Sequence, residues 1–381
     1  MALNRSNYSL YWLSFMKTII PAVIFLGVAF VLPVYGSSKK PLRRALFVAM
    51  LDDRTVFSSR TDIKRLVDSS EQSGINILYV QVYRANKSWF PSKVVDSAPY
   101  VRCFKDVSAD PFETLIKLAH LKGIKVYAWL NILSLSKNIE APLIKKYGAS
   151  ILTCNIKDKQ KLQDYEIDDQ YFLEPGDLRV RAELVKVVEE VLRAYPELDG
   201  LQFDYMRYPD KNPSYGFTRL NVERFKKATG ARVINENSLE WKDWKRTQVN
   251  EFLINLVERA RAIKPKIIIS ATGCMPYQRA YYEAFQDWPL WLRRGIVDQI
   301  TLMNYSPDPI EFSRWLNFAK SVVGDITDIN VGIGAYKLVD SPGIFAEELR
   351  ICEDSGCGGC AIFYYDSLLK NPLLRKSLGD N

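Results

Sequence analysis

The stretch LDGLQFDYMRYPD, which runs from Leu198 to Asp210, indicates the fold of the whole chain. A turn precedes an apolar run at residues 200–205 that is typical of a strand, and a proline soon ends it. Because side chains alternate along a strand, Gln202 and Asp204 share one face, opposite the apolar face. If helices cover the apolar face, both polar side chains point into an interior. A carboxylate there is costly to bury, so we interpret Asp204 as functional rather than as a partner of Arg207 or a nearby loop.

Apolar runs alternate with amphipathic runs over most of the chain. The strand-like runs are residues 46–51, 76–82, 125–130, 200–205, 266–272, 298–304, 329–334 and 360–365. The helix-like runs are residues 62–73, 111–122, 178–195, 241–264, 288–294, 310–323 and 342–354. Eight strands in alternation with helices predict an α/β fold of the (β/α)8 type, a TIM barrel. A doubly wound open sheet is the alternative, but the chain has no GxGxxG or Walker loop to support it.

Two of the predicted loops are unusually long. Residues 84–110 follow the second predicted strand and residues 131–177 follow the third, and both exceed an ordinary βα loop. In a barrel, both would lie at the face where the strands end and where barrel enzymes build their sites. We therefore predict extended loops after strands 2 and 3 beside the site.

An apolar run, TIIPAVIFLGVAFVLPV at residues 18–34, follows Arg5 and Lys17 and precedes a short polar linker. This order is typical of a secretory signal peptide. The run is marginal in length for spanning a bilayer, so an uncleaved membrane anchor is the alternative. We expect residues 1–40 to form a signal peptide or anchor with a linker, and residues 41–381 to form the catalytic domain. The protein would then be exported, and be periplasmic, extracellular or anchored facing outside the cytoplasm.

The composition excludes several classes of chemistry. The chain has a single histidine, His120, which nearly removes Ser-His-Asp, Cys-His and histidine–metal sites. With 44 acidic residues and 21 tyrosines, catalysis should rest on carboxylates, and we expect neither a metal nor a cofactor. The net charge is +8, but the basic residues are scattered among the acidic ones, so we expect no nucleic-acid partner.

Six cysteines are present, and Cys357-Gly-Gly-Cys360 has the spacing of a redox or metal site. No second CxxC pair exists and no histidine is nearby, which disfavours zinc. We interpret the motif as a turn whose thiols are incidental. In an oxidising compartment a pair such as Cys103 and Cys154 could link two loops, although the pairing does not follow from the sequence.

Polar and aromatic residues gather at or just after the predicted strand ends. Aromatic rings stack on the faces of sugars, carboxylates and amides bind hydroxyl groups, and glycoside hydrolysis requires two carboxylates. Packing is the alternative for any single aromatic residue, and helix capping is the alternative for Asp308. The candidates for substrate binding are Arg84, Trp89, Asn131, Arg207, Tyr208, Asn304, Tyr305, Tyr365 and Asp366.

Several motifs point to one family. They are DGLQFDYMRYP at residues 199–209, VQV at 80–82 with FPS at 90–92, DPF at 110–112 through KVYAWLN at 125–131, and LEPG at 173–176. With these motifs the chain resembles the glycosyl hydrolase-like family 10 proteins, the DUF187 group, from about residue 44 to residue 368. The resemblance implies a TIM-barrel glycosidase of the bacterial envelope.

The central stretch also looks like the DGxDxDxE signature of chitinase-type barrels. However, Gln202 replaces an aspartate, and Met206 stands where the catalytic glutamate would be, so chitinase-type chemistry is disfavoured. The nearer analogy is to barrels whose nucleophile is an aspartate on the fourth strand and whose acid follows the sixth strand. It implies Asp204 as nucleophile or general base and Asp308 as general acid.

We therefore expect an exported glycoside hydrolase that cleaves a cell-envelope or extracellular polysaccharide, or an oligosaccharide, with two carboxylates. Asp52 and Asp366 are reserve candidates for the general acid. A glycan-binding barrel without activity is the first alternative, and a metal-dependent hydrolase built on Asp52, Asp53 and Asp204 is the second. We expect a monomer that contacts the membrane only through its N-terminal segment, if that segment is uncleaved.

Overall fold

The computed structural model describes residues 42–51, 55–157, 159, 161–210 and 214–379. The predicted signal peptide or membrane anchor, at residues 1–40, lies outside the described residues. Among the helices that are described, none combines the length and the apolar character needed to cross a membrane. Export and membrane attachment therefore stay predictions.

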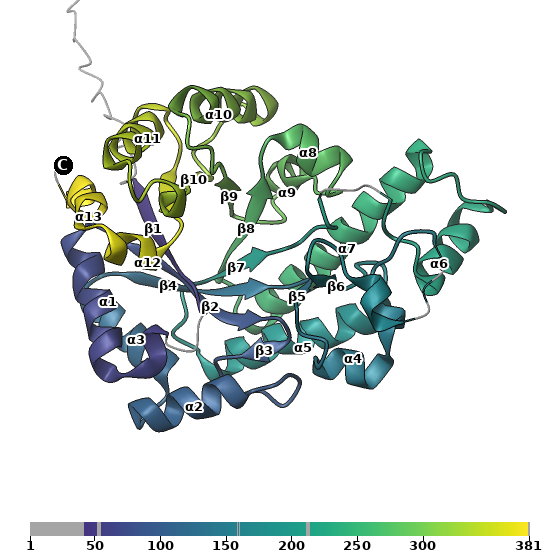
Figure 1. The fold of residues 1–381 in the computed structure, drawn as a ribbon, viewed down its shortest axis with the longest axis horizontal. Helices are drawn as coiled ribbons and strands as arrows, with labels where there is room; N and C mark the ends of the chain where they lie inside the picture. The colour runs from purple at the N-terminus through teal and green to yellow at the C-terminus, as the bar shows by residue number, and fades with distance from the viewer. Residues whose placement is uncertain (1–41, 52–54, 158, 160, 211–213, 380–381) are drawn as a thin grey trace, which may run out of the picture. The chain divides into compact units, whose positions relative to one another are not determined.

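Eight parallel strands form a closed barrel (Figure 1). Their order around the barrel follows the chain, and the first strand pairs with both the second and the last, which closes the sheet. The strands are β1 (Arg43–Val48), β2 (Ile77–Arg84), β4 (Lys125–Asn131), β7 (Gly200–Asp204), β8 (Ile268–Cys274), β9 (Gln299–Met303), β10 (Ile329–Ile333) and β11 (Gly359–Ile362). The predicted (β/α)8 barrel is confirmed. Only the last predicted strand, residues 360–365, is clearly too long, since β11 ends at Ile362 and a helix begins at Tyr365.

Helices surround the barrel on its outside (Figure 1). Those that match predicted runs are α1 (Arg60–Gln72), α3 (Pro111–Leu121), α5 (Leu178–Ala194), α7 (Leu239–Ile263), α9 (Trp288–Arg293), α10 (Pro309–Val323) and α11 (Pro342–Asp354). After β11 the chain continues into α12 (Tyr365–Lys370) and α13 (Pro372–Gly379). Several helices begin after a short polar side chain that accepts a hydrogen bond from the first turn, as Ser59, Asp110 and Asp287 do.

The predicted long loops carry elements of their own. The loop after β2 holds β3 (Lys87–Ser88) and α2 (Ala98–Val107). The loop after β4 holds α4 (Pro142–Tyr147) and a small antiparallel sheet of β5 (Ser134–Ser136) and β6 (Tyr171–Phe172). A further insertion, not expected from the sequence, follows β7. The remaining elements are α6 (Arg219–Thr229), α8 (Tyr277–Tyr282) and the 3-10 turns η1 (Val56–Ser58), η2 (Ala149–Ile151), η3 (Leu162–Tyr165) and η4 (Ala335–Lys337).

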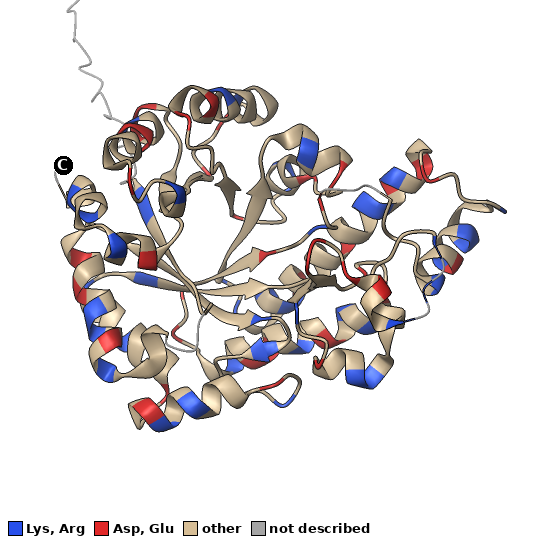
Figure 2. Ribbon diagram, viewed as in Figure 1, with Lys and Arg blue, Asp and Glu red and all other residues tan. Residues whose placement is uncertain are grey.

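The inside of the barrel is packed with aromatic and small side chains. Tyr79, Tyr127 and Trp129 are buried there together, and a larger apolar core fills the space between strands and helices. Lys, Arg, Asp and Glu are interspersed over the outer helices and loops, and the strands carry few of them (Figure 2). β4 and β7 pair so that Asn131 lies beside Asp204.

Gln202 and Asp204 both point inward, as the alternation along the strand predicts. Gln202 is fully buried, and Asp204 is only 6% exposed. β7 approaches the interior rings closely, because a Cβ at Gly200 would lie 2.7 Å from the ring of Tyr127. Glycine at that position therefore lets β7 take its place in the barrel, with Asp204 at its carboxyl end.

Candidate active site

A pocket of about 730 Å³ lies over the carboxyl ends of the barrel strands. This is the face at which TIM-barrel enzymes place their sites. The side chains that line it come from strand ends and from the long loop after β4. They are Phe47, Leu51, Gln81, Arg84, Trp129, Asn131, Ser136, Lys137, Asp168, Asp169, Gln170, Asp204, Tyr205, Arg207, Thr272, Met303, Tyr305 and Phe363.

Asp204 is held in this pocket by three hydrogen bonds. Its Oδ1 accepts from the Thr272 hydroxyl at 2.7 Å and from the backbone N–H of Tyr205 at 2.7 Å. Its Oδ2 accepts from the indole N–H of Trp129 at 3.1 Å. Because the donors lie on both sides of β7, the carboxylate has a fixed orientation. A carboxylate held in this way is suited to attack a ligand atom or to activate a water molecule beside it.

The chain turns sharply after Asp204. Tyr205 adopts a left-handed backbone conformation, with φ of +55°, which is uncommon for a residue other than glycine. The guanidinium of Arg207 stacks on the Tyr205 ring at 4.8 Å and pairs with Asp210 at 3.2 Å. Arg279 pairs with the same Asp210 carboxylate. These contacts hold a positive charge in the pocket that also contains Asp204.

Two amide side chains, those of Gln81 and Asn131, form another polar part of the pocket lining. Gln81 accepts from the backbone N–H of Met50 at 2.9 Å and donates to Asn131 at 3.2 Å. Both amides are nearly buried, and Asn131 lies beside Asp204 across the pairing of β4 and β7. The NH2 group of Asn131 can still donate to a ligand hydroxyl.

Aromatic rings form the apolar part of the pocket. The centroids of Tyr305 and Phe363 are stacked 5.3 Å apart, and Phe363 also meets Trp129 edge-on at 6.0 Å. Burial, and then the nearby charge of Asp204, raise the pKa of Tyr305 well above its ordinary value. Its phenol therefore remains a neutral donor at ordinary pH. Gly332 leaves room for this ring, because a Cβ there would lie 3.1 Å from it.

The long loop after β4 reaches the pocket through a tight turn at Asp168 and Asp169. Their φ angles of +51° and +60° are those of a two-residue hairpin turn. Gln170 accepts a hydrogen bond from Ser134 at 3.0 Å, and Asp169 lies 3.6 Å from the ammonium of Lys137. Two carboxylates therefore reach the pocket from this loop. In the described part of the chain, no group of three or more His, Cys, Asp or Glu is arranged to hold a metal ion.

The family model of glycosyl hydrolase-like 10 proteins matches residues 43–343. The chain belongs to this family. The glycosyl hydrolase DigH of Escherichia coli strain K12 is 24% identical over 295 residues, which are 71% of this chain and 65% of DigH. The glycosyl hydrolase YngK of Bacillus subtilis strain 168 is 22% identical over 280 residues, which are 66% of this chain and 50% of YngK. The match thus spans less than two thirds of either relative.

Solved structures share the fold of this glycosyl hydrolase-like 10 protein. The catalytic domain of β-amylase from Paenibacillus polymyxa matches with a TM-score of 0.59 and 10% identity, over 88% of this chain and 97% of that one. α-L-Fucosidase isoenzyme 2 from Paenibacillus thiaminolyticus matches with a TM-score of 0.59 and 12% identity, over 89% of this chain and 48% of that one. At these identities the likeness concerns the TIM barrel alone.

The pocket of this family member brings together several residues that the sequence predicts for the site. They are Arg84, Asn131, Asp204, Arg207 and Tyr305. Asp52, the reserve acid, lies outside the described residues, as does Asp53. Leu51, directly before them, lines the pocket.

Two predicted residues that follow β9, the sixth strand of the barrel, do not line the pocket. Asp308 accepts a hydrogen bond from the backbone N–H of Ile310 at 2.9 Å and is the N-cap of α10. Asp308 therefore acts as a helix cap, which was the alternative to its predicted role as general acid. Asn304 is fully buried and donates to the carbonyl of Phe312 at 2.9 Å. Neither placement supports a direct contact with a ligand in this pocket.

Four more of the predicted residues also lie outside the pocket lining. Trp89 and Tyr365 pack in the core between strands and helices. Asp366 lies in the first turn of α12. Tyr208 is buried and directs its hydroxyl to Glu174. Each of these residues follows a strand in the chain, but the local path of the backbone turns its side chain away from the pocket.

The sequence did not predict the other residues that line the pocket, among them Gln81, Trp129, Asp168, Asp169, Thr272 and Phe363. Gln81 and Thr272 carry a recognisable signal, since each is a polar side chain near the end of an apolar strand. The pair of aspartates carries none, because it lies inside a long loop whose path has no local periodicity.

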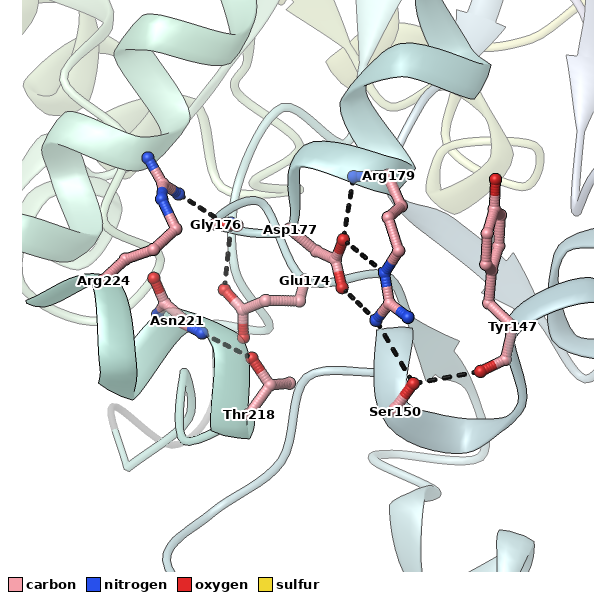
Figure 3. A network of polar contacts seen from close by, with 9 residues as sticks. All are labelled: Tyr147, Ser150, Glu174, Gly176, Asp177, Arg179, Thr218, Asn221 and Arg224. Atoms are coloured by element: carbon pink, nitrogen blue, oxygen red, sulfur yellow. Dashed lines mark hydrogen bonds and ion pairs between the residues drawn. The ribbon is translucent and has the colours of Figure 1, made fainter.

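A buried network supports the loop that carries Arg207. Glu174 is fully buried and accepts a short hydrogen bond from the Tyr208 hydroxyl and another from the Gly176 N–H at 3.1 Å. Burial raises the pKa of Glu174. Figure 3 shows this carboxylate beside α6, from which Arg224 donates to the carbonyl of Gly176. The network ties the loop after β4 to the loop after β7 beside the pocket.

Proposed function

We propose that this chain is a glycoside hydrolase in which Asp204 is the nucleophile or the general base. The observation that supports this best is the position of Asp204 in the pocket of about 730 Å³, held by three hydrogen bonds. A fixed carboxylate reduces the reorganisation needed to attack an anomeric carbon or to activate a water beside it. Membership of the glycosyl hydrolase-like 10 family supports the same function.

The pocket offers both kinds of contact that a sugar requires. Tyr305 and Phe363 present aromatic rings to its C–H groups. Arg84, Asn131 and Arg207 present donors to hydroxyl or acid groups. The substrate in this proposal is a polysaccharide or oligosaccharide of the cell envelope or of the extracellular space. The net charge of +8 favours an anionic glycan.

Cleavage by two carboxylates also needs a general acid. Among the described residues that line the pocket, only Asp168 and Asp169 carry a carboxylate besides Asp204. We therefore place the acid in this pair rather than at Asp308, which caps α10. Asp52, outside the described residues, is the remaining alternative. A separation of about 5–5.5 Å from Asp204 in the working enzyme would give retention, and one of about 6.5–9.5 Å would give inversion.

The proposed place of action is outside the cytoplasm, either periplasmic or extracellular, with the N-terminal segment cleaved or kept as an anchor. Support comes from the apolar run at residues 18–34, between basic residues and a short polar linker. This part of the proposal rests on the sequence alone.

The test is hydrolysis by the full chain, purified in mild detergent, on a panel of bacterial wall glycans and exopolysaccharides, with new reducing ends as the readout. We expect Asp204→Asn to lose about a thousandfold or more of the wild-type rate while remaining folded. Asp308→Asn is the matched control, since asparagine also caps a helix and should leave the rate nearly unchanged. Equal rates for Asp204→Asn and the wild type would overturn the proposal.

A glycan-binding barrel without activity is the alternative. It is supported by the position of Asp168 and Asp169 on a loop tip, with the Asp169 side chain 80% exposed, rather than on a barrel strand. Glycan binding that is retained by Asp204→Asn, with no release of reducing ends by the wild type, would favour this alternative.

A further inference from the structure

Three buried cysteines lie together at the end of the barrel opposite the pocket. Cys352 lies on α11, Cys357 in the turn that follows, and Cys360 near the start of β11. Cys352 and Cys360 are fully buried, and Cys357 is 6% exposed. The Cys357 thiol donates to the carbonyl oxygen of Gly359, the residue directly before Cys360, at 3.2 Å. The sulfur of Cys357 lies 3.2 Å from the carbonyl oxygen of Cys352.

The backbone between Cys357 and Cys360 is held on both sides. The N–H of Gly358 donates to the carbonyls of Ile326 and Ile329 at 3.1 and 2.9 Å, and its carbonyl accepts from the N–H of Arg43 at 3.0 Å. A Cβ at Gly358 would lie 1.8 Å from the Arg43 guanidinium. The turn therefore requires glycine, and these hydrogen bonds hold its backbone against β1 and the start of β10.

We infer that Cys357 forms a reversible disulfide with Cys352 or Cys360 and that the third thiol of the cluster can exchange with that bond. The Cys357 sulfur lies 3.2 Å from the backbone oxygens of Cys352 and of Gly359, so side-chain rotation can bring it to a neighbouring thiol at the S–S bond length of about 2.05 Å. A metal site is the other use of clustered thiols, but among the described residues this cluster does not have the arrangement of one.

Cys357 is the member suited to react first. It is the only thiol of the three with any exposure. Hydrogen bonds from Cys352 and Cys360 lower the pKa of the Cys357 thiol, whereas burial raises that of Cys352. The thiolate is the nucleophile in thiol–disulfide exchange, so the partly exposed and more acidic thiol meets the oxidant.

The oxidant is a disulfide, such as oxidised glutathione or a disulfide-exchange protein. The Cys357 thiolate attacks one of its sulfurs, the S–S bond of the oxidant breaks, and one thiolate leaves and takes up a proton. The second cysteine loses its proton, attacks the Cys357 sulfur and releases the other half of the oxidant as a thiol. Two electrons pass to the oxidant, which becomes two thiols, and the protein gains one disulfide.

The test counts free thiols in the full chain before and after incubation with oxidised glutathione, followed by removal of the reagent and denaturation. We expect the count to fall from six to four and to return to six with dithiothreitol. Peptide mapping without reduction should then find Cys357 in the cross-link. Six remaining thiols, a glutathione adduct without a cross-link, or a cross-link that lacks Cys357 would each overturn the inference.

Matched variants separate this cluster from the other cysteines. Cys357→Ser should keep all five of its thiols after the same oxidation, because the reacting member is absent. Cys103→Ser removes a cysteine on α2, outside the cluster, and should fall from five thiols to three. If Cys357→Ser does not fold, the peptide map of the wild type still decides the matter.

Discussion

The hydroxyl of Thr272 donates a 2.7 Å hydrogen bond to Asp204 and so joins the carboxyl ends of β8 and β7 inside the pocket. Thr272 is 2% exposed, so water does not readily replace this donor. A hydrogen bond to a charged group contributes about 1.5–3 kcal/mol. The contact therefore has a large share in orienting the carboxylate of the proposed reaction.

Thr272→Val removes that donor while keeping the shape of the side chain. We expect kcat/KM on a hydrolysed glycan to fall about 10- to 100-fold, because Asp204 loses one of its three donors. Thr272→Ser keeps the hydroxyl and should retain most of the activity. Full activity in Thr272→Val would show that this contact does not orient a reacting group.

Tyr208→Phe removes the hydroxyl that donates to the buried carboxylate of Glu174. We expect the free energy of unfolding to fall by about 1–3 kcal/mol, because the buried Glu174 loses this hydrogen bond and keeps the weaker one from the Gly176 N–H. Urea unfolding followed by fluorescence measures this change. Tyr282→Phe is the control, since Tyr282 is 58% exposed, and it should change stability by less than about 0.5 kcal/mol. Equal effects for the two variants would argue against a stabilising role of the network.

Glu348 on α11 predicts a pH dependence of stability. It is fully buried, and in the described part of the protein neither carboxylate oxygen has a hydrogen-bond partner. Burial, and then the charge of Glu347, raise the pKa of Glu348 from 4.5 to about 8. Since the folded pKa is the higher one, the contribution of this group to stability is complete below about pH 4.5 and is lost as the pH rises towards 8.

Glu348→Gln removes this titration. We expect the free energy of unfolding of the wild type to fall more between pH 5 and pH 8 than that of Glu348→Gln, as measured by urea unfolding at each pH. Glu258→Gln, at an exposed position of α7, should follow the wild-type profile. Parallel profiles for the wild type and Glu348→Gln would show that the buried carboxyl does not titrate in this range.

Gly332→Ala tests whether the ring of Tyr305 needs the space that Gly332 leaves beside it. A Cβ at Gly332 would lie 2.5 Å from the carbonyl oxygen of Leu302 and 3.1 Å from the ring of Tyr305. We expect a loss of about 1–3 kcal/mol in stability and a weaker affinity for glycan, because the ring must move. Gly343→Ala adds a methyl group with no atom within 4 Å and should be nearly neutral. If Gly332→Ala has the stability and the glycan affinity of the wild type, then β10 can shift without cost.

The barrel and the direction of Asp204 could be predicted because both depend on local periodicity. Residues 200–205 alternate polar and apolar side chains, and that alternation alone turns Gln202 and Asp204 to the same side. Asp308 shows the limit of this reasoning, since an aspartate before a proline suits both a general acid after a strand and a helix cap. Its contact with Ile310 is the cap.

By itself, the sequence determined the succession of strands and helices, the closure that their alternation implies, and the inward carboxylate at the end of the fourth barrel strand. Only the tertiary structure decided which side chains meet that carboxylate. Trp129, Thr272 and Asp168 are far from Asp204 in the chain, and their approach depends on strand register and on the path of a long loop. Local patterns carry no information on such distances, because contacts between residues remote in sequence are set by the packing of the whole barrel.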